Sequence, residues 1–105
     1  MHFDDAILRV FEVRARPGKA GPLKQKLSHT SVSVVKGEPG NLGYFFGQAQ
    51  SSDEHDLVFI SVWKDLASIK LRFGEDWEQS YLPEGYDELI DSCSLRHLRC
   101  DGELE

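Results

Sequence analysis

Residues 56–63 read DLVFISVW, and this stretch decides how the rest of the chain is interpreted. Apolar side chains occupy both of its parities: Leu57, Phe59 and Trp63 on one, and Val58, Ile60 and Val62 on the other. An antiparallel strand with one face in water alternates apolar and polar residues, and this strand does not. We therefore expect a central strand whose two faces are both covered.

The elements predicted around this strand have the order strand, helix, strand, strand, helix, strand. Asp65 is a plausible N-cap for the second helix, and the polar loop SSDEH joins the two central strands as a hairpin. The predicted elements, from alternation, helical spacing and turn residues, are a strand over residues 7–16, a helix over 22–36, strands over 44–50 and 56–63, a helix from 66 to about 77, a short helical piece over 86–90 and a last strand over 93–100.

This order is that of a ferredoxin-like α+β fold, a four-stranded antiparallel sheet with both helices on one face. The 105 residues suffice for one domain, with a core over about residues 7–100 and terminal tails at 1–5 and 101–105. Two helices cover one face only, and no residues are left to cover the apolar residues of the other. A homodimer that pairs sheet against sheet, as in a dimeric α+β barrel, is the economical solution.

Composition excludes several classes of function. The net charge is −6 and the pI is about 5.1, and the lysines and arginines are scattered, so nucleic acid is not an expected partner. No apolar run approaches the roughly 20 residues of a membrane span. The first residues, MHFDDA, lack the basic and apolar regions of a signal peptide. A cytoplasmic location is the default expectation.

The sequence predicts neither a disulfide nor a metal site. Cys93 and Cys100 bracket one predicted strand, where seven residues span roughly 23 Å, far beyond disulfide reach. His2, His29 and His55 form no ligand spacing with one another or with cysteine. No cofactor is therefore expected.

Several segments together resemble the antibiotic biosynthesis monooxygenase family of dimeric α+β barrels. They are RVFEVRARPGK, EPGNLGYFF, LVFISVWKD, and GEDWE followed by Pro-Glu and LRHL, and the likeness covers about residues 7–99. The resemblance implies a pocket in each subunit between the sheet and its own helices. It also implies oxygenation of hydroxylated polycyclic aromatics or quinols without metal or flavin, in which a phenol or anthrone loses a proton and its anion reacts with O₂.

A second branch of that family degrades haem and relies on an Asn, a Trp and a His. Aligned without gaps, these positions fall on Phe11, Leu71 and Tyr81 of this chain. None matches, although a tyrosine can ligate haem iron. Haem degradation is therefore the third hypothesis only.

Polar candidates for chemistry are His97, Arg72 and Arg9. His97 has the near-neutral pKa range of a general base for a phenolic proton, and the alternative is a hydrogen-bonded core or interface residue. Arg72 and Arg9 offer bidentate donors to an anionic substrate. Arg9 shares a strand parity with apolar neighbours and needs a partner, for which an ion pair at a dimer interface is the alternative.

Aromatic candidates for substrate binding are Trp63, Phe73, Trp77, Tyr81 and Tyr44. Trp63 either forms a wall against a planar ligand or is a large core residue at a strand end. Trp77 and Tyr81 are one helical turn apart and are predicted to plug the pocket mouth. Tyr44 is either a core residue or part of the pocket lining.

The leading hypothesis is thus a homodimeric, cofactor-independent monooxygenase acting on a small, planar hydroxylated aromatic or quinol. The alternative is a non-catalytic domain of the same fold that binds a small hydrophobic ligand or only assembles. A fold alone does not choose between them.

Overall fold

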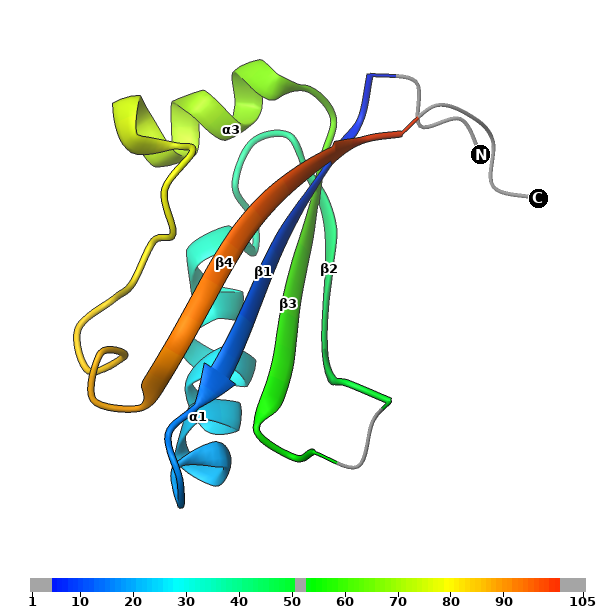
Figure 1. Ribbon diagram of the computed structural model, residues 1–105. Helices are drawn as coiled ribbons and strands as arrows, with labels where there is room; N and C mark the ends of the chain where they lie inside the picture. The colour runs from blue at the N-terminus through cyan, green and yellow to red at the C-terminus, as the bar shows by residue number, and fades with distance from the viewer. Residues whose placement is uncertain (1–4, 51–52, 101–105) are drawn as a thin grey trace.

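A computed structural model describes residues 5–50 and 53–100 of the chain. The strands form one antiparallel sheet of order β2-β3-β1-β4, and the helices pack on one of its faces (Figure 1). This confirms the ferredoxin-like α+β fold. The strands are β1 Ile7–Ala15, β2 Asn41–Gln48, β3 Asp56–Trp63 and β4 Ile90–Arg99. The tails predicted at 1–5 and 101–105 lie outside the described residues, except for Asp5.

The first helix runs without a break through α1 (Ala20–Lys26), η1 (Leu27–Ser31) and α2 (Val32–Val35). The helix predicted over 22–36 is confirmed, but its middle turn is π-helical, which the spacing did not predict. The second helix is α3 (Leu66–Phe73), and Asp65 caps it as predicted, because its carboxylate accepts the Ser68 N–H at 2.8 Å.

Two predicted elements are corrected by the structure. β2 begins at Asn41, three residues earlier than expected. The short helix predicted over 86–90 is wrong: turns occupy this segment and β4 begins at Ile90. Ala15 pairs with Ile90 in the sheet, and the Arg16 N–H donates to the Leu89 carbonyl at 2.8 Å, so strand pairing holds the end of this segment in an extended conformation.

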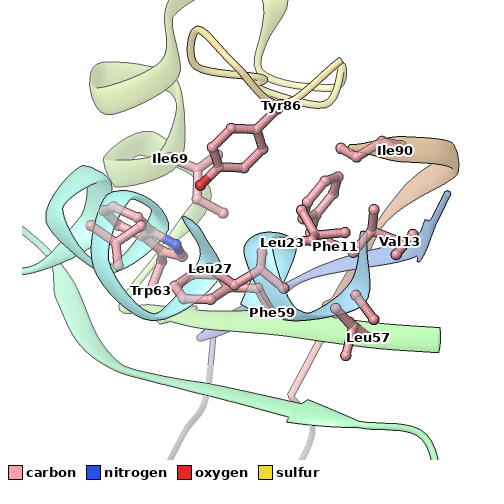
Figure 2. Close-up of a cluster of buried hydrophobic side chains, with 13 residues drawn as sticks. Phe11, Val13, Leu23, Leu27, Leu57, Phe59, Trp63, Ile69, Tyr86 and Ile90 are labelled. Carbon is pink, nitrogen blue, oxygen red and sulfur yellow. The ribbon is translucent and has the colours of Figure 1, made fainter. Parts of the chain in front are cut away.

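The strand register decides which side chains face the helices. Phe11 lies opposite both Phe59 and Leu95, and Arg9 lies opposite both Ser61 and His97. Opposed residues share a face, so all six side chains point to the helix side of the sheet. The core lies there, and Figure 2 shows it filled by side chains from the sheet, both helices and the segment before β4.

The other face of the sheet, which we call the open face, is apolar along its central strands. By register its apolar members are Leu8, Val10, Phe45, Val58, Ile60, Val62 and Leu98. Phe45 is 64% exposed, and none of the described helices crosses this face. The sequence expectation of a face without a cover is therefore met in the isolated subunit. None of the described helices is long and apolar enough to cross a membrane.

Candidate functional site

A pocket lies between the helix face of the sheet and the helices. Its internal volume is about 40 Å³. β1, β3 and β4 form its floor, the first helix forms one wall, and α3 with the segment that follows it forms the mouth. The lining residues are Arg9, Phe11, Ser31, Val34, Val35, Phe59, Ser61, Phe73, Tyr81, Pro83 and Leu95.

Arg9 is the only charged residue among the lining residues of this pocket. It is 5% exposed, and its Nη1 and Nη2 donate to the carbonyls of Trp77 (2.5 Å) and Gln79 (3.2 Å). Its guanidinium carbon lies 3.8 Å from the centre of the Phe73 ring. Burial, and secondarily the charge of Arg72, lower the pKa of Arg9 to about 10, so the guanidinium stays charged at neutral pH.

His97 is the side-chain partner of Arg9. Its Nε2 lies 3.0 Å from Nη1 of Arg9. A guanidinium only donates, so Nε2 accepts and the neutral ring carries its proton on Nδ1. Burial and, secondarily, the positive charge of Arg9 lower the pKa of His97, and Glu78 opposes them with a smaller effect. The lowered pKa keeps the ring neutral.

This arrangement resolves which face Arg9 and His97 occupy. Both lie on the helix face, and Arg9 binds main-chain carbonyls and an imidazole. Arg9 therefore does not point to the open face of the sheet. A buried cation whose described partners are all neutral keeps its full charge available to a ligand in the pocket.

Trp63 and Arg72 do not line this pocket. Trp63 is fully buried, and its indole N–H donates to the Ser61 hydroxyl at 2.8 Å, as the core interpretation expects. Arg72 donates from Nε to the Val34 carbonyl at 2.7 Å and approaches Glu38 at 3.5 Å. Its guanidinium thus ties α3 to the end of the first helix.

The aromatic candidates divide between the lining and its surroundings. Phe73 and Tyr81 line the pocket, with ring centres 6.1 Å apart. Trp77 lies outside the lining and packs edge-on against His97 at 5.1 Å. Because η2 (Gly74–Asp76) ends before Trp77, the two predicted plug residues do not share a helix. Tyr44 stacks on Phe59 at the β2 edge, outside the lining.

Sequence reasoning missed the two serines of the lining. Ser61 lies opposite Arg9 in the register of β3 and β1, so strand parity alone was a sufficient signal for it. Ser31 ends the π-helical turn η1, and the spacing of apolar residues along a helix does not predict such a turn. Both hydroxyls add polar atoms to a lining whose one charged group is the guanidinium of Arg9.

The three positions aligned with the haem-degrading branch do not converge on one pocket. Phe11 and Tyr81 line it, but Leu71 is 77% exposed on the outer side of α3. Among the described residues, no group of three or more His, Cys, Asp or Glu side chains is placed to hold a metal ion. Cys93 and Cys100 are free thiols.

Comparison with known proteins gives a consistent picture of the fold. PA3566 from Pseudomonas aeruginosa is 22% identical, covers 97% of this chain and 100% of its own, and superposes with a TM-score of 0.75. SnoaB from Streptomyces nogalater, described as a cofactor-independent oxygenase, is 15% identical, with coverage of 95% and 97% and a TM-score of 0.73. A conserved protein from Methanosarcina mazei Go1 is 19% identical, with coverage of 94% and 96% and a TM-score of 0.73.

At these identities the structural likeness establishes the fold alone. A search of the curated proteins found no match. The model of the family described as antibiotic biosynthesis monooxygenase matches residues 6–79, which include β1, β2, β3 and both helices. Because this match spans well over half of the residues of the chain, the chain belongs to the antibiotic biosynthesis monooxygenase family.

Proposed function

We propose that the protein is a monooxygenase that oxidises a small hydroxylated aromatic or quinol without a cofactor. The observation that carries the proposal is Arg9, a buried cation at the wall of an apolar pocket. Such a group stabilises an oxyanion much more than it stabilises the neutral phenol, because charge interactions are strong where water is excluded. It therefore favours ionisation of the substrate inside the pocket.

The ionised substrate is the species that reacts with O₂. For an anthrone, a CH₂ carbon becomes a carbonyl carbon, a four-electron oxidation that matches the four-electron reduction of O₂. One oxygen atom enters the carbonyl and the other leaves as water. Substrate and O₂ thus balance without another reductant, and the task of the protein is to bind the anion and to take up and return protons.

His97 is the proposed base for the phenolic proton. At rest its Nε2 lone pair accepts from Arg9. A substrate oxygen that takes the place of His97 on the guanidinium frees this lone pair next to the phenolic proton. The lowered pKa of His97 keeps the base neutral and ready at neutral pH. Trp77 supports the pair through its carbonyl and its ring.

Substrate entry requires the pocket to enlarge. Its volume of about 40 Å³ is close to that of one water molecule, whereas a cavity of roughly 150 Å³ accepts benzene. Tyr81, which is half exposed, and Pro83 lie on the irregular segment between η2 and β4. We propose that this segment moves outward to admit the ring, with Phe73 and Tyr81 as its aromatic contacts.

The same small volume favours a second candidate function. A domain that only binds a small hydrophobic molecule, or that only assembles, does not need a pocket able to hold an aromatic ring and O₂ together. In that case Arg9 serves to hold the segment after α3 through the carbonyls of Trp77 and Gln79. Oxygen uptake distinguishes the two functions.

The decisive experiment measures O₂ consumption with anthrones, quinols and phenols. We expect uptake above the autoxidation rate, and a loss of about 100-fold in kcat/KM for Arg9→Gln, as for other lost anion-stabilising donors. Arg9→Lys keeps the charge and should retain part of the activity. His97→Ala should remain folded and lose turnover. The matched control for Arg9→Gln is Arg16→Gln, which changes an exposed arginine directly after β1.

Two outcomes would overturn the oxygenase proposal. One is no uptake above autoxidation with any compound of the panel, which would favour the binding or assembly function. The other is full activity in a folded Arg9→Gln variant, since the proposal places the anion on this guanidinium. Circular dichroism of each variant separates loss of chemistry from loss of fold.

We also propose a homodimer in which two open faces pack together. Exposed apolar area on a sheet face is costly in water at about 25 cal/mol per Å². The apolar side chains of the open face are continuous across β2, β3, β1 and β4 in register. A second copy presents the same surface and can cover it by two-fold symmetry.

A further inference from the structure

Tyr86 occupies an unusual position beside the π-helical turn η1. It is fully buried and enters the core from the turn before β4 (Figure 2). Its hydroxyl donates to the Lys26 carbonyl at 3.0 Å and lies 2.6 Å from the hydroxyl oxygen of Ser31. These two residues flank the π-helical turn, one just before it and the other at its end. The phenol therefore bridges the turn from one end to the other.

One arrangement of the hydroxyl protons allows both contacts of Tyr86 to be hydrogen bonds at once. A carbonyl oxygen can only accept, so the single phenolic proton of Tyr86 points to Lys26. By geometry alone either oxygen of the 2.6 Å contact could be the donor, and both contacts are hydrogen bonds at once only when the Ser31 hydroxyl donates to the phenolic oxygen. Ser31 has no second proton to donate. In this arrangement Ser31, which lines the pocket, presents only lone pairs towards it.

The opposite wall of the pocket has the reverse polarity. Arg9 carries only donors. Ser61 accepts the indole N–H of Trp63, and its own hydroxyl proton remains to be donated. The sheet wall thus offers donors to a ligand, and the helix wall offers an acceptor.

We propose that Ser31 is a specificity-determining residue that selects substrates with a second, un-ionised hydroxyl or N–H group. This proposal rests on the proposed function. One oxygen of the substrate binds Arg9 as the anion, and a separate donor on the same ring system binds the lone pairs of Ser31. Tyr86 is the positioning residue that holds Ser31 in its acceptor state. The substrate class is narrowed to aromatics with at least two protic groups.

The test measures binding by tryptophan fluorescence, without oxygen and at neutral pH. The ligands are naphthols, dihydroxynaphthalene isomers and the monomethyl ethers of those isomers. The proteins are wild type, Ser31→Ala, Tyr86→Phe and the control Ser33→Ala. Ser33 belongs to the same helix, is exposed, and donates to the Thr30 carbonyl outside the pocket. Arg9→Gln is measured in parallel to test the anion site by itself.

We expect wild type to bind its best dihydroxynaphthalene about tenfold more tightly than the matching naphthol or methyl ether, the usual effect of one hydrogen bond to a buried acceptor. In Ser31→Ala the dihydroxynaphthalene and the matching naphthol should bind with nearly equal affinity. In Tyr86→Phe the pocket keeps its shape, but the Ser31 proton is released and can donate to the ether oxygen, so discrimination against the methyl ether should disappear. Ser33→Ala should behave as wild type.

Three results would overturn the inference. If wild type binds all ligands equally while Arg9→Gln loses binding, the second subsite is absent and the proposed anion site stands. If Ser31→Ala keeps the full discrimination, the donor is recognised elsewhere. If no ligand binds to wild type, the proposed function fails and the inference fails with it. If Tyr86→Phe does not fold, the comparison of wild type with Ser31→Ala still decides whether Ser31 recognises the second protic group.

Discussion

The guanidinium of Arg9 lies 3.8 Å from the centre of the Phe73 ring and 3.0 Å from an imidazole nitrogen of His97. At the scale of single residues this pair sets the electrostatics of the site. A cation in an apolar wall is costly unless its donors are satisfied, and the Trp77 and Gln79 carbonyls meet that requirement without cancelling the charge. Arg9 is thus held in place and remains attractive to an anion.

The His97 ring predicts a pH dependence of stability. Its pKa lies below the ordinary value of 6.5, through burial and then Arg9, with Glu78 opposing. Folding therefore favours the neutral ring, so the unfolded state binds more protons as the pH falls below about 6.5. The contribution is complete above that pH and is lost as the pH falls through the folded pKa. Thermal unfolding between mildly acidic and neutral pH measures it.

The matched variant for this prediction is His97→Gln, whose side-chain oxygen can accept from Arg9 but does not titrate in this range. We expect a smaller loss of melting temperature on acidification than in wild type. His29→Gln, which changes an exposed histidine of η1, should retain the wild-type slope. Identical slopes in wild type and His97→Gln would mean that protonation of His97 does not contribute to the loss of stability at low pH. This result would contradict the prediction.

At the scale of elements, close contacts between segments decide local structure that propensity does not. The turn before β2 packs directly on α3: a Cβ added at Gly40 would lie 2.1 Å from the Ser68 hydroxyl oxygen. The Gly40 carbonyl also accepts the Lys64 N–H at 2.8 Å. This turn and the N-terminus of α3 therefore form one packed unit at the end of the sheet.

Gly40→Ala should accordingly be among the more damaging substitutions of the chain. Its φ of +84° disfavours any residue with a Cβ, and the contact with Ser68 adds overpacking, so we expect a loss of about 3 kcal/mol in the free energy of unfolding. Gly37→Ala is the matched control, since φ is +78° but the space is open, and it should lose only about 1 kcal/mol. Urea denaturation measures both. Equal losses would mean that the turn shifts to relieve the contact.

At the scale of the whole molecule, the two faces of the sheet have different roles. The helix face holds the core and the pocket, and the open face carries apolar side chains of which Phe45 and Leu98 are exposed in one subunit. Dimerisation through the open face would leave each pocket and its mouth accessible on the far side of the sheet. Such a dimer would keep assembly separate from ligand binding.

Ile60→Glu should convert the proposed dimer into a monomer. Ile60 lies at the centre of the open face, between Val10 and Phe45 in register, and a carboxylate buried there without a partner is strongly unfavourable. Leu71→Glu is the matched control, because Leu71 is 77% exposed on the helix side. Light scattering after size exclusion gives the masses. A monomeric wild type, or an Ile60→Glu protein that stays dimeric, contradicts the open-face dimer.

Local patterns were sufficient for most of the fold. Strand alternation, the Asp65 cap and the Gly-Pro breaks predicted both helices, all four strands and their antiparallel order, because each depends on residues close in sequence. They failed at residues 86–90, where a short helical piece was predicted. There the pairing of Ala15 with Ile90 and the hydrogen bond from Arg16 to the Leu89 carbonyl, both across more than 70 residues of chain, prevailed.

The composition of the site was only partly predictable. Phe73 and Tyr81 line the pocket, while Trp63 lies in the core and Arg72 ties two helices together. From its chemistry alone an arginine or a tryptophan can serve a core, a helix contact or a ligand equally well. Which of these it serves depends on the neighbours that packing supplies.

By itself, the sequence determined the fold class, the apolar character of both sheet faces and the family, since these follow from periodicity and from residue types along the chain. Only the tertiary structure decided that Arg9 and His97 meet on the helix face and that Ser31 lines the pocket beside the Tyr86 hydroxyl. The reason is physical: Arg9 and His97 are 88 residues apart and Ser31 and Tyr86 are 55 apart. Strand register and a π-helical turn bring these groups together, and neither leaves a periodic signal in the sequence.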